Sequence, residues 1–170
     1  MEISDNLFDF IEKYSQENPI KLRLKRFENL NFDLSFAIDQ IESRQKIKNK
    51  LPLWNQNKKL LFPSVLSAEQ ASSEITAKYK QDIIGSRYKS ICDLTGGLGV
   101  DSYYFAASAE KVTYVERYPL YCNVAKYNFS ILQKNNIQIV CSDSLKFILG
   151  CSIKFDAFYI DPARRNSENK

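Results

Sequence analysis

A cluster of glycines directly follows an apolar segment that ends in an acidic residue. Asp93 closes the apolar run, and Gly96, Gly97 and Gly99 come within the next six positions. A strand that stops at glycines lets a ligand approach bare backbone, and a helix that begins there directs free N–H groups at that ligand. The spacing therefore predicts a turn that binds a small polar ligand at the end of a strand.

A second acid stands where the next strand would end. The largely apolar run 112–115 is followed by Glu116, twenty residues after Gly96. In sheets that bind nucleotides, an acid at this place lies within reach of a ribose. The glycine turn and this acid together predict a site for a cofactor that carries a nucleoside.

Two more acids repeat the arrangement further along the chain. Asp143 follows the run 137–141, and Asp161 follows the run 155–160. Each has an ordinary explanation by itself, because Asp143 could cap a helix and Asp161 could begin a turn. Ligands of open parallel sheets bind at the carboxyl ends of the strands, beside the point where the strand order reverses. A strand order of 3-2-1-4 would place Asp93 and Asp161 at that point, so four acids at four strand tips favour one shared site.

Other common site chemistries do not fit these residues. A dinucleotide fingerprint needs a third glycine where Ser102 stands, and the P-loop signature is absent. Several carboxylates would repel a pyrophosphate and suit a cationic ligand better. The sequence has no histidine, which removes Ser–His and Cys–His nucleophiles and argues against a metal site of the zinc type.

The elements that would position these acids alternate after residue 88. Strands are predicted over 90–94, 111–116, 137–141 and 155–160, and helices over 99–108, 118–134 and 144–149. Such alternation predicts an α/β fold with a partial doubly wound, Rossmann-like parallel sheet of about four strands. Because such sheets usually carry about six strands, we expect residues 89–170 to be a partial domain, truncated after the fourth strand of a longer polypeptide.

Residues 1–88 have the pattern of a helical N-terminal region. Helices are predicted over about 5–14, 18–27, 37–51 and 67–85. Ser67 and Gln70 form a capping-box pattern that would open the last of these helices. The segment 51–63 is predicted to be irregular.

Composition places the chain among ordinary globular proteins. It has 170 residues, of which 44% are hydrophobic and 26% charged. No apolar run could span a membrane, and the N-terminus lacks a signal pattern. The four cysteines are widely spaced, so we expect buried, reduced thiols in a cytoplasmic protein; they are Cys92, Cys122, Cys141 and Cys151.

The net charge of +4 is unevenly placed along the chain. The segment 43–66 has six basic residues and no acid, namely Arg44, Lys46, Lys48, Lys50, Lys58 and Lys59. Such a run can be a solvated helix face and loop. It can also be the surface that contacts a nucleic-acid backbone. Composition does not decide between the two.

At the glycine turn and the strand-end acids, the chain resembles class I S-adenosylmethionine-dependent methyltransferases. Four segments resemble one bacterial family more narrowly, namely 37–45, 50–54, 66–74 and 161–165. Members of that family have a helical N-terminal region, the methyltransferase fold and a THUMP-like RNA-binding domain, which we expect to be absent from this chain. The similarity covers most of residues 20–166.

The resemblance implies a transferase that uses S-adenosyl-L-methionine for RNA methylation, with a base amino group as a candidate acceptor. It implies contacts to the methionine part of the cofactor from Asp93, Thr95, Gly96, Gly97 and Gly99. It implies that the ribose is bound by Glu116, and the adenine amino group by Ser142 and Asp143. The segment 67–74 matches an element that folds over the cofactor in relatives resembling trimethylguanosine synthase.

The resemblance also implies a catalytic segment. The sequence 161–164 stands where amino-methylating relatives carry Asp/Asn-Pro-Pro-aromatic, which implies roles for Asp161, Pro162 and Arg164. Arg164 replaces the aromatic residue on which relatives stack a base, so Arg164 or Arg165 would contact a phosphate or stack through its guanidinium plane. RNA is the implied partner, with the basic stretch helping to bind its backbone, and we expect the activity of the truncated chain to be impaired.

Two other classes of function share parts of the pattern. An oxidoreductase domain that binds a dinucleotide would use the same turn, but the missing third glycine argues against it. A non-catalytic module for nucleotide binding or protein interaction could retain a methyltransferase-like fold. Titration with S-adenosylhomocysteine and with NAD would separate these alternatives.

Overall fold

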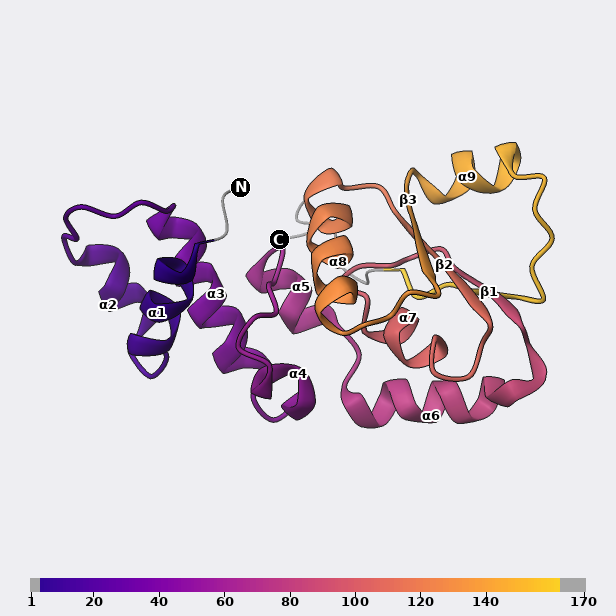
Figure 1. Ribbon diagram of the computed structural model, residues 1–170, viewed down its shortest axis with the longest axis horizontal. Coiled ribbons are helices and arrows are strands. Elements are labelled where there is room, and N and C mark those ends of the chain that lie inside the picture. The colour runs from indigo at the N-terminus through magenta and orange to yellow at the C-terminus, as the bar shows by residue number, and fades with distance from the viewer. Residues whose placement is uncertain (1–3, 163–170) are drawn as a thin grey trace. The chain divides into compact units, whose positions relative to one another are not determined.

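The computed structural model describes residues 4–162 and divides into two compact units. The first unit extends to Glu69 and the second begins at Gln70. Figure 1 shows the first unit in indigo and purple and the second from magenta to yellow. In the part of the chain described, no helix combines the length and the apolar character needed to cross a membrane.

The first unit is built from short helices. They are α1 (Asp5–Lys13), α2 (Pro19–Leu24), α3 (Leu34–Ile47), α4 (Pro52–Gln56) and α5 (Val65–Gln70). Side-chain caps begin two of them: Asn18 accepts hydrogen bonds from the first turn of α2, and Asp33 accepts one from Phe36 N. These residues satisfy backbone N–H groups that have no partner inside the helix.

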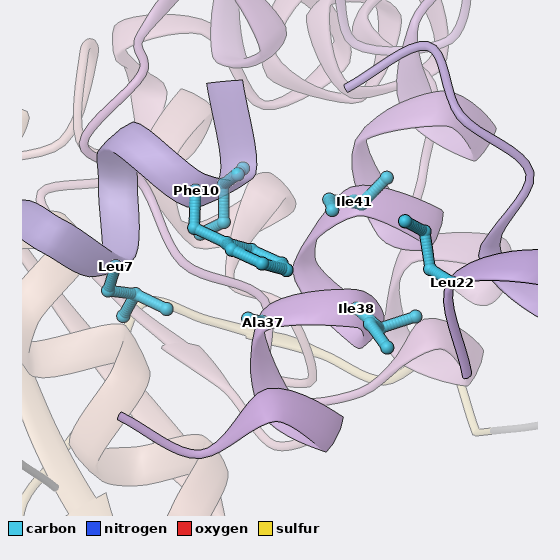
Figure 2. Packing of buried hydrophobic residues seen from close by; sticks show 7 residues of the cluster. Leu7, Phe10, Leu22, Ala37, Ile38 and Ile41 are labelled. Atoms are coloured by element: carbon cyan, nitrogen blue, oxygen red, sulfur yellow. The ribbon is translucent and has the colours of Figure 1, made fainter. Parts of the chain in front are cut away.

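The core of the first unit joins α1, α2 and α3. Figure 2 shows side chains of α1 and α2 gathered around α3; the labelled residues are Leu7, Phe10, Leu22, Ala37, Ile38 and Ile41. All six are buried. In α1 and α3 these residues recur at helical spacing and form one buried face, whereas Leu24, which marked the second helix in the sequence, is exposed.

The predicted helix ends need correction in three places. The second helix ends at Leu24, not near residue 27, and the third ends at Ile47, well before Pro52. The segment predicted to be irregular contains α4, where Pro52 occupies the first turn and Trp54 is buried. A proline that was interpreted as ending one helix thus begins another, as its fixed φ and missing N–H allow.

The helix predicted over 67–85 is two helices. Ser67 lies inside α5, and the capping-box prediction is wrong because Ser73 begins α6 (Glu74–Ile84). The Ser73 hydroxyl accepts a hydrogen bond of 3.1 Å from Thr76 N. Helix α6 belongs to the second compact unit, whereas the sequence grouped it with the helical region 1–88.

The second unit contains the predicted parallel sheet. Its strands are β1 (Ser90–Asp93), β2 (Lys111–Glu116), β3 (Ile137–Cys141) and β4 (Ala157–Tyr159), in the order β3-β2-β1-β4. All three pairings are parallel. The predicted fold class is confirmed, and the strand order is the one that would place Asp93 and Asp161 together, because it reverses between β1 and β4.

Helices connect the strands and cover both faces of the sheet. They are α7 (Val100–Phe105), α8 (Pro119–Ile131) and α9 (Ser144–Gly150), with a 3-10 turn η1 (Gly85–Arg87) before β1. Side chains of α7 and α8 pack on one face, where Phe105 lies against Ile91 and Phe129 against Tyr114. Phe147 of α9 packs on the other face against a cluster that includes Cys92.

The four cysteines are all free thiols, but not all are buried. Cys92 and Cys122 are buried, whereas Cys141 is exposed and Cys151 is half-buried. Burial raises the pKa of the Cys92 and Cys122 thiols to about 12. The prediction of four buried thiols is therefore wrong for Cys141 and Cys151.

Candidate functional site

The glycine turn joins β1 to α7, and at Gly96 and Gly99 there is no room for a side chain. A Cβ on Gly96 would lie 2.3 Å from the Tyr114 ring, and one on Gly99 would lie 2.7 Å from the Phe129 ring. Gly97 and Gly99 have φ values of +54° and +88°, which L side chains rarely adopt. The Tyr114 hydroxyl donates a 2.7 Å hydrogen bond to Gly97 O, so the turn rests on a buried aromatic ring.

Asp93 lies beneath this turn. Its side chain accepts a 3.0 Å hydrogen bond from Thr95 N and one of 2.6 Å from the Ser102 hydroxyl, one on each oxygen. The residue is 1% exposed. Burial raises the pKa of the Asp93 carboxyl to about 7, although both hydrogen bonds oppose this shift. In this geometry Asp93 holds the turn from below.

Glu116 ends β2 and also holds the turn. One carboxylate oxygen accepts a 3.1 Å hydrogen bond from Gly97 N, and the other accepts one of 2.9 Å from Tyr118 N. Each carboxylate oxygen has two lone pairs, so each could accept another donor. The side chain is half-buried and oriented before any ligand arrives.

Ser142 and Asp143 follow β3 at the same end of the sheet. Ser142 N donates a 2.9 Å hydrogen bond to Glu116 O, which extends the pairing of the two strands. One oxygen of Asp143 accepts hydrogen bonds from Leu145 N and Lys146 N, at 3.0 and 3.1 Å. Asp143 is thus the N-cap of α9, and its exposed carboxylate retains capacity for a further donor.

Asp161 follows β4 and is attached to the glycine turn through its backbone. Its N–H donates a 2.8 Å hydrogen bond to the Thr95 hydroxyl, and Leu94 N donates one of 2.9 Å to Tyr159 O. Asp161 and Pro162 are exposed. Arg164 and Arg165 lie outside the described residues.

The structure thus brings the predicted turn and acids to one end of the sheet, with Asp161 and Glu116 each bonded to the turn. Because the strands are parallel and lie in this order, the residues at their carboxyl ends had to be close to one another. Their contacts with a cofactor stay a prediction.

A group of residues that the sequence analysis missed surrounds the Asp161 carboxylate. Lys80 of α6 contacts Ser72, Asp101, Tyr159 and Asp161. Tyr159 stands two residues before Asp161, so strand alternation could have placed the two side chains on the same face. Lys80 carries no such signal, because its sequence separation from Asp161 is long and no motif includes it.

The basic stretch is largely engaged in contacts within the first unit. Arg44 is buried, and its guanidinium donates to Lys58 O at 2.8 Å and to Leu60 O at 2.6 Å. Burial lowers its pKa to about 10. The Lys50 ammonium donates to Ala68 O and Glu69 O, at 3.2 and 2.6 Å. Arg44 is therefore a structural residue, and its assignment to a nucleic-acid surface is wrong.

The other lysines of the stretch have exposed side chains. Three form ion pairs with acids: Lys46 with Glu69, Lys58 with Glu12 and Lys59 with Asp5. Lys48 is exposed as well. Exposed ion pairs contribute little to stability, so Lys46, Lys58 and Lys59 could exchange a carboxylate for a phosphate, and Lys48 could contact a phosphate as well.

Within residues 4–162, no group of three or more acidic or cysteine side chains is placed to hold a metal ion. No family model matches the chain. Over 80 residues, the chain is 32% identical to an uncharacterized RNA methyltransferase of Mycoplasma mobile. That match covers 47% of this chain and 22% of the relative.

Two solved structures resemble the fold. A candidate methyltransferase from Porphyromonas gingivalis W83 shares 27% identity at a TM-score of 0.69, covering 85% of this chain and 36% of that one. The cofactor-bound protein Rv0187 from MTB shares the fold, with 16% identity and a TM-score of 0.51 over 84% of this chain and 60% of that one.

The sheet is therefore a partial Rossmann-like methyltransferase fold, and the chain is similar to methyltransferases in sequence. It spans about a fifth of the curated relative and about a third of the Porphyromonas protein.

Proposed function

We propose that this chain binds S-adenosyl-L-methionine at the glycine turn and supports methyl transfer to RNA at Asp161. The observation that carries the proposal is the attachment of both neighbouring strand ends to one turn. Glu116 accepts a hydrogen bond from Gly97 N, and Asp161 N donates to Thr95. A cofactor that contacts the turn would therefore lie close to both acids.

The residues present suit this cofactor. The bare backbone of Gly96, Gly97 and Gly99, with Thr95, would surround the methionine part. Glu116 would accept the ribose hydroxyls, and Ser142 with Asp143 would meet the adenine amino group. When bound, the cofactor supplies a methyl group on a positively charged sulfur, and carboxylates at this end of the sheet favour that charge. Asp93 would act by holding the turn that makes these contacts.

Asp161 would act on the methyl acceptor. The lone pair of an exocyclic base nitrogen is delocalised, so the nitrogen is a poor nucleophile. An exposed carboxylate that accepts an N–H hydrogen bond would orient this nitrogen, stabilise the positive charge that develops as the methyl group passes from sulfur to nitrogen, and accept the proton that the nitrogen then loses. Alignment of donor and acceptor would supply much of the remaining rate. Arg164 would contact a neighbouring phosphate or stack on a base.

RNA is the proposed partner for two reasons. The Mycoplasma relative is named an RNA methyltransferase. The exposed lysines of the basic stretch could contact phosphates, three of them by exchanging an acidic partner; they are Lys46, Lys58 and Lys59, together with Lys48. A base within a duplex would first have to be flipped out.

Four free thiols fit a reducing compartment such as the cytoplasm.

The test measures cofactor binding and methyl transfer separately. Calorimetry would measure the affinity for S-adenosylhomocysteine, and labelled cofactor would measure methyl transfer to total RNA. Asp161→Ala should leave the affinity within about twofold and lower the transfer rate by about a hundredfold or more, the usual range for a group that assists proton transfer. Asp82→Ala is the matched control, because Asp82 is exposed on α6.

Other outcomes would indicate a different division of roles or a different function. Equal loss of affinity and transfer in Asp161→Ala would contradict the division of roles. Affinity for S-adenosylhomocysteine without transfer to any RNA would leave a cofactor-binding module. Binding of NAD in its place would favour a dinucleotide-dependent function.

A further inference from the structure

Lys80 joins α6 to the candidate catalytic carboxylate. Its ammonium lies 3.2 Å from Asp101 Oδ1 and 3.4 Å from Asp161 Oδ2, and it donates to the Tyr159 hydroxyl. A further hydrogen bond of 2.8 Å reaches the Ser72 hydroxyl. The Lys80 side chain is 21% exposed, compared with 55% for Asp161. A largely buried cation thus faces a largely exposed anion.

The Asp161 carboxylate is held through one of its two oxygens. Lys80 and the Tyr159 hydroxyl both contact Oδ2, the latter at 3.1 Å. As far as the described residues go, every hydrogen bond to this carboxylate reaches Oδ2. The backbone N–H of Asp161 is fixed at Thr95. The backbone and Oδ2 of Asp161 are therefore held, and Oδ1 keeps its capacity to accept a hydrogen bond.

We propose that Lys80 is a positioning residue that, together with Tyr159, presents Asp161 Oδ1 to the methyl acceptor. This inference rests on the proposed function of Asp161. The Tyr159 hydroxyl also lies 3.3 Å from Asp101 Oδ2, so two carboxylates approach the same phenol. Lys80 is the cation between them. Without it, the two negative charges would repel, and the exposed Asp161 would turn towards water.

The role differs from simple stabilisation. The ion pair of Lys80 with the exposed Asp161 contributes little to folding, whereas its pair with Asp101, which is 14% exposed, contributes to stability. The direction of the acceptor oxygen, in contrast, affects the rate strongly, because a small misplacement of reacting groups costs up to about a hundredfold. We therefore expect loss of Lys80 to change catalysis and the orientation of Asp161 more than cofactor binding.

The experiment compares Lys80→Met, Lys80→Arg and Tyr159→Phe with the control Lys78→Met, which changes an exposed lysine on the same helix. Three quantities are measured: the affinity for S-adenosylhomocysteine, kcat and KM for methyl transfer to total RNA, and the carboxyl NMR signal of ¹³C-labelled Asp161. Lys80→Met should lower kcat by about ten- to a hundredfold at nearly constant cofactor affinity, and shift or broaden the Asp161 signal. Lys80→Arg should restore a large part of kcat.

Each remaining result tests either the positioning role of Lys80 or the proposed function of the chain. An unchanged Asp161 signal in Lys80→Met, or an unchanged kcat, would overturn the positioning role. A parallel loss of cofactor affinity and kcat would also overturn it and assign Lys80 to the cofactor site. If the unaltered chain transfers no methyl group while the Asp161 signal still depends on Lys80, the proposed function fails and the positioning of the carboxylate stands.

Discussion

Asp93 is buried at the end of β1 and stabilises the glycine turn. The sequence placed it at the tip of β1, and the structure places its carboxylate under the glycine turn, bonded to Thr95 and Ser102. Ser102 stands where a dinucleotide fingerprint would have its third glycine. The residue that breaks that fingerprint thus supplies the hydroxyl that satisfies Asp93.

Asp93 gives a prediction about pH. Its pKa is 3.8 when unperturbed and about 7 in the fold, so the native state holds a proton that the unfolded chain releases. The stabilisation from this proton is complete below pH 3.8 and is lost as the pH rises through 7. Relative to Asp93→Asn, the free energy of unfolding should therefore fall between these values, by up to about 1.4 kcal/mol per pH unit. Urea unfolding across this pH range measures it, and parallel curves for the two proteins would contradict the explanation.

The glycines of the turn give a second prediction at this scale. Gly96→Ala and Gly99→Ala should each lower the free energy of unfolding by about 2–3 kcal/mol, because the added methyl group meets the buried ring of Tyr114 or Phe129. Gly150→Ala is the control, since its Cβ would meet nothing within 4 Å. Chemical denaturation checks all three. A loss in the control as large as in the other two would mean that steric contact is not the cause.

Residue spacing predicted only part of the site. The acids that follow β2, β3 and β4, and the glycines, could be found because each stands directly after an apolar run. Lys80 and Asp101 could not, because the contacts of Lys80 with Asp101 and with Asp161 depend on how α6 and α7 pack. The burial of Arg44 could not be predicted either. A run of basic residues does not show which of them donates hydrogen bonds to backbone carbonyls inside the fold.

At the scale of elements, strands were easier to predict than helix ends. Apolar runs of strand length, each followed by an acid or a glycine, predicted the ends of β1 to β4 to within about two residues. Helix ends depended on competing signals, as at Pro52, which begins α4, and at Ser67, which lies inside α5. The alternative cap Ser73 stands only six residues later, and packing selects between such sites.

The cap of α6 can be tested directly. Ser73→Ala should lower the free energy of unfolding by about 1 kcal/mol, because Thr76 N loses its side-chain acceptor. Ser73→Asn should be nearly neutral, since asparagine caps helices equally well. Thermal or urea unfolding of the two variants distinguishes the cap from other effects. Equal losses in both variants would show that the hydroxyl matters for another reason, such as its contact with the Thr76 hydroxyl.

At the scale of the whole molecule, the chain combines a helical unit with a partial methyltransferase fold. The sequence predicted this division in outline, and the structure assigns α6 to the unit with the sheet. Helix α6 carries Lys80, so the contact between Lys80 and Asp161 lies within one unit. The helical unit keeps its own core around α3 and its own buried cation, Arg44.

Two variants in the helical unit distinguish the structural role of Arg44 from RNA binding by an exposed lysine. Arg44→Met should cost about 3 kcal/mol of stability, because backbone carbonyls of the 57–60 loop lose a buried donor. Lys48→Met should leave stability unchanged and, if RNA binds here, weaken RNA binding with a smaller dependence on salt. Urea unfolding and RNA filter binding at several salt concentrations measure both effects. An unchanged stability in Arg44→Met would contradict the structural role.

We propose that the turn after β1, with the acid that ends β2, binds the nucleoside and amino-acid parts of S-adenosyl-L-methionine. The decisive measurement is calorimetric titration of the chain with S-adenosylhomocysteine and, separately, with NAD. We predict one site of micromolar affinity for the first ligand and no binding of the second. Absence of binding to S-adenosylhomocysteine, or equal binding of both ligands, would show that the turn is not a site for this cofactor.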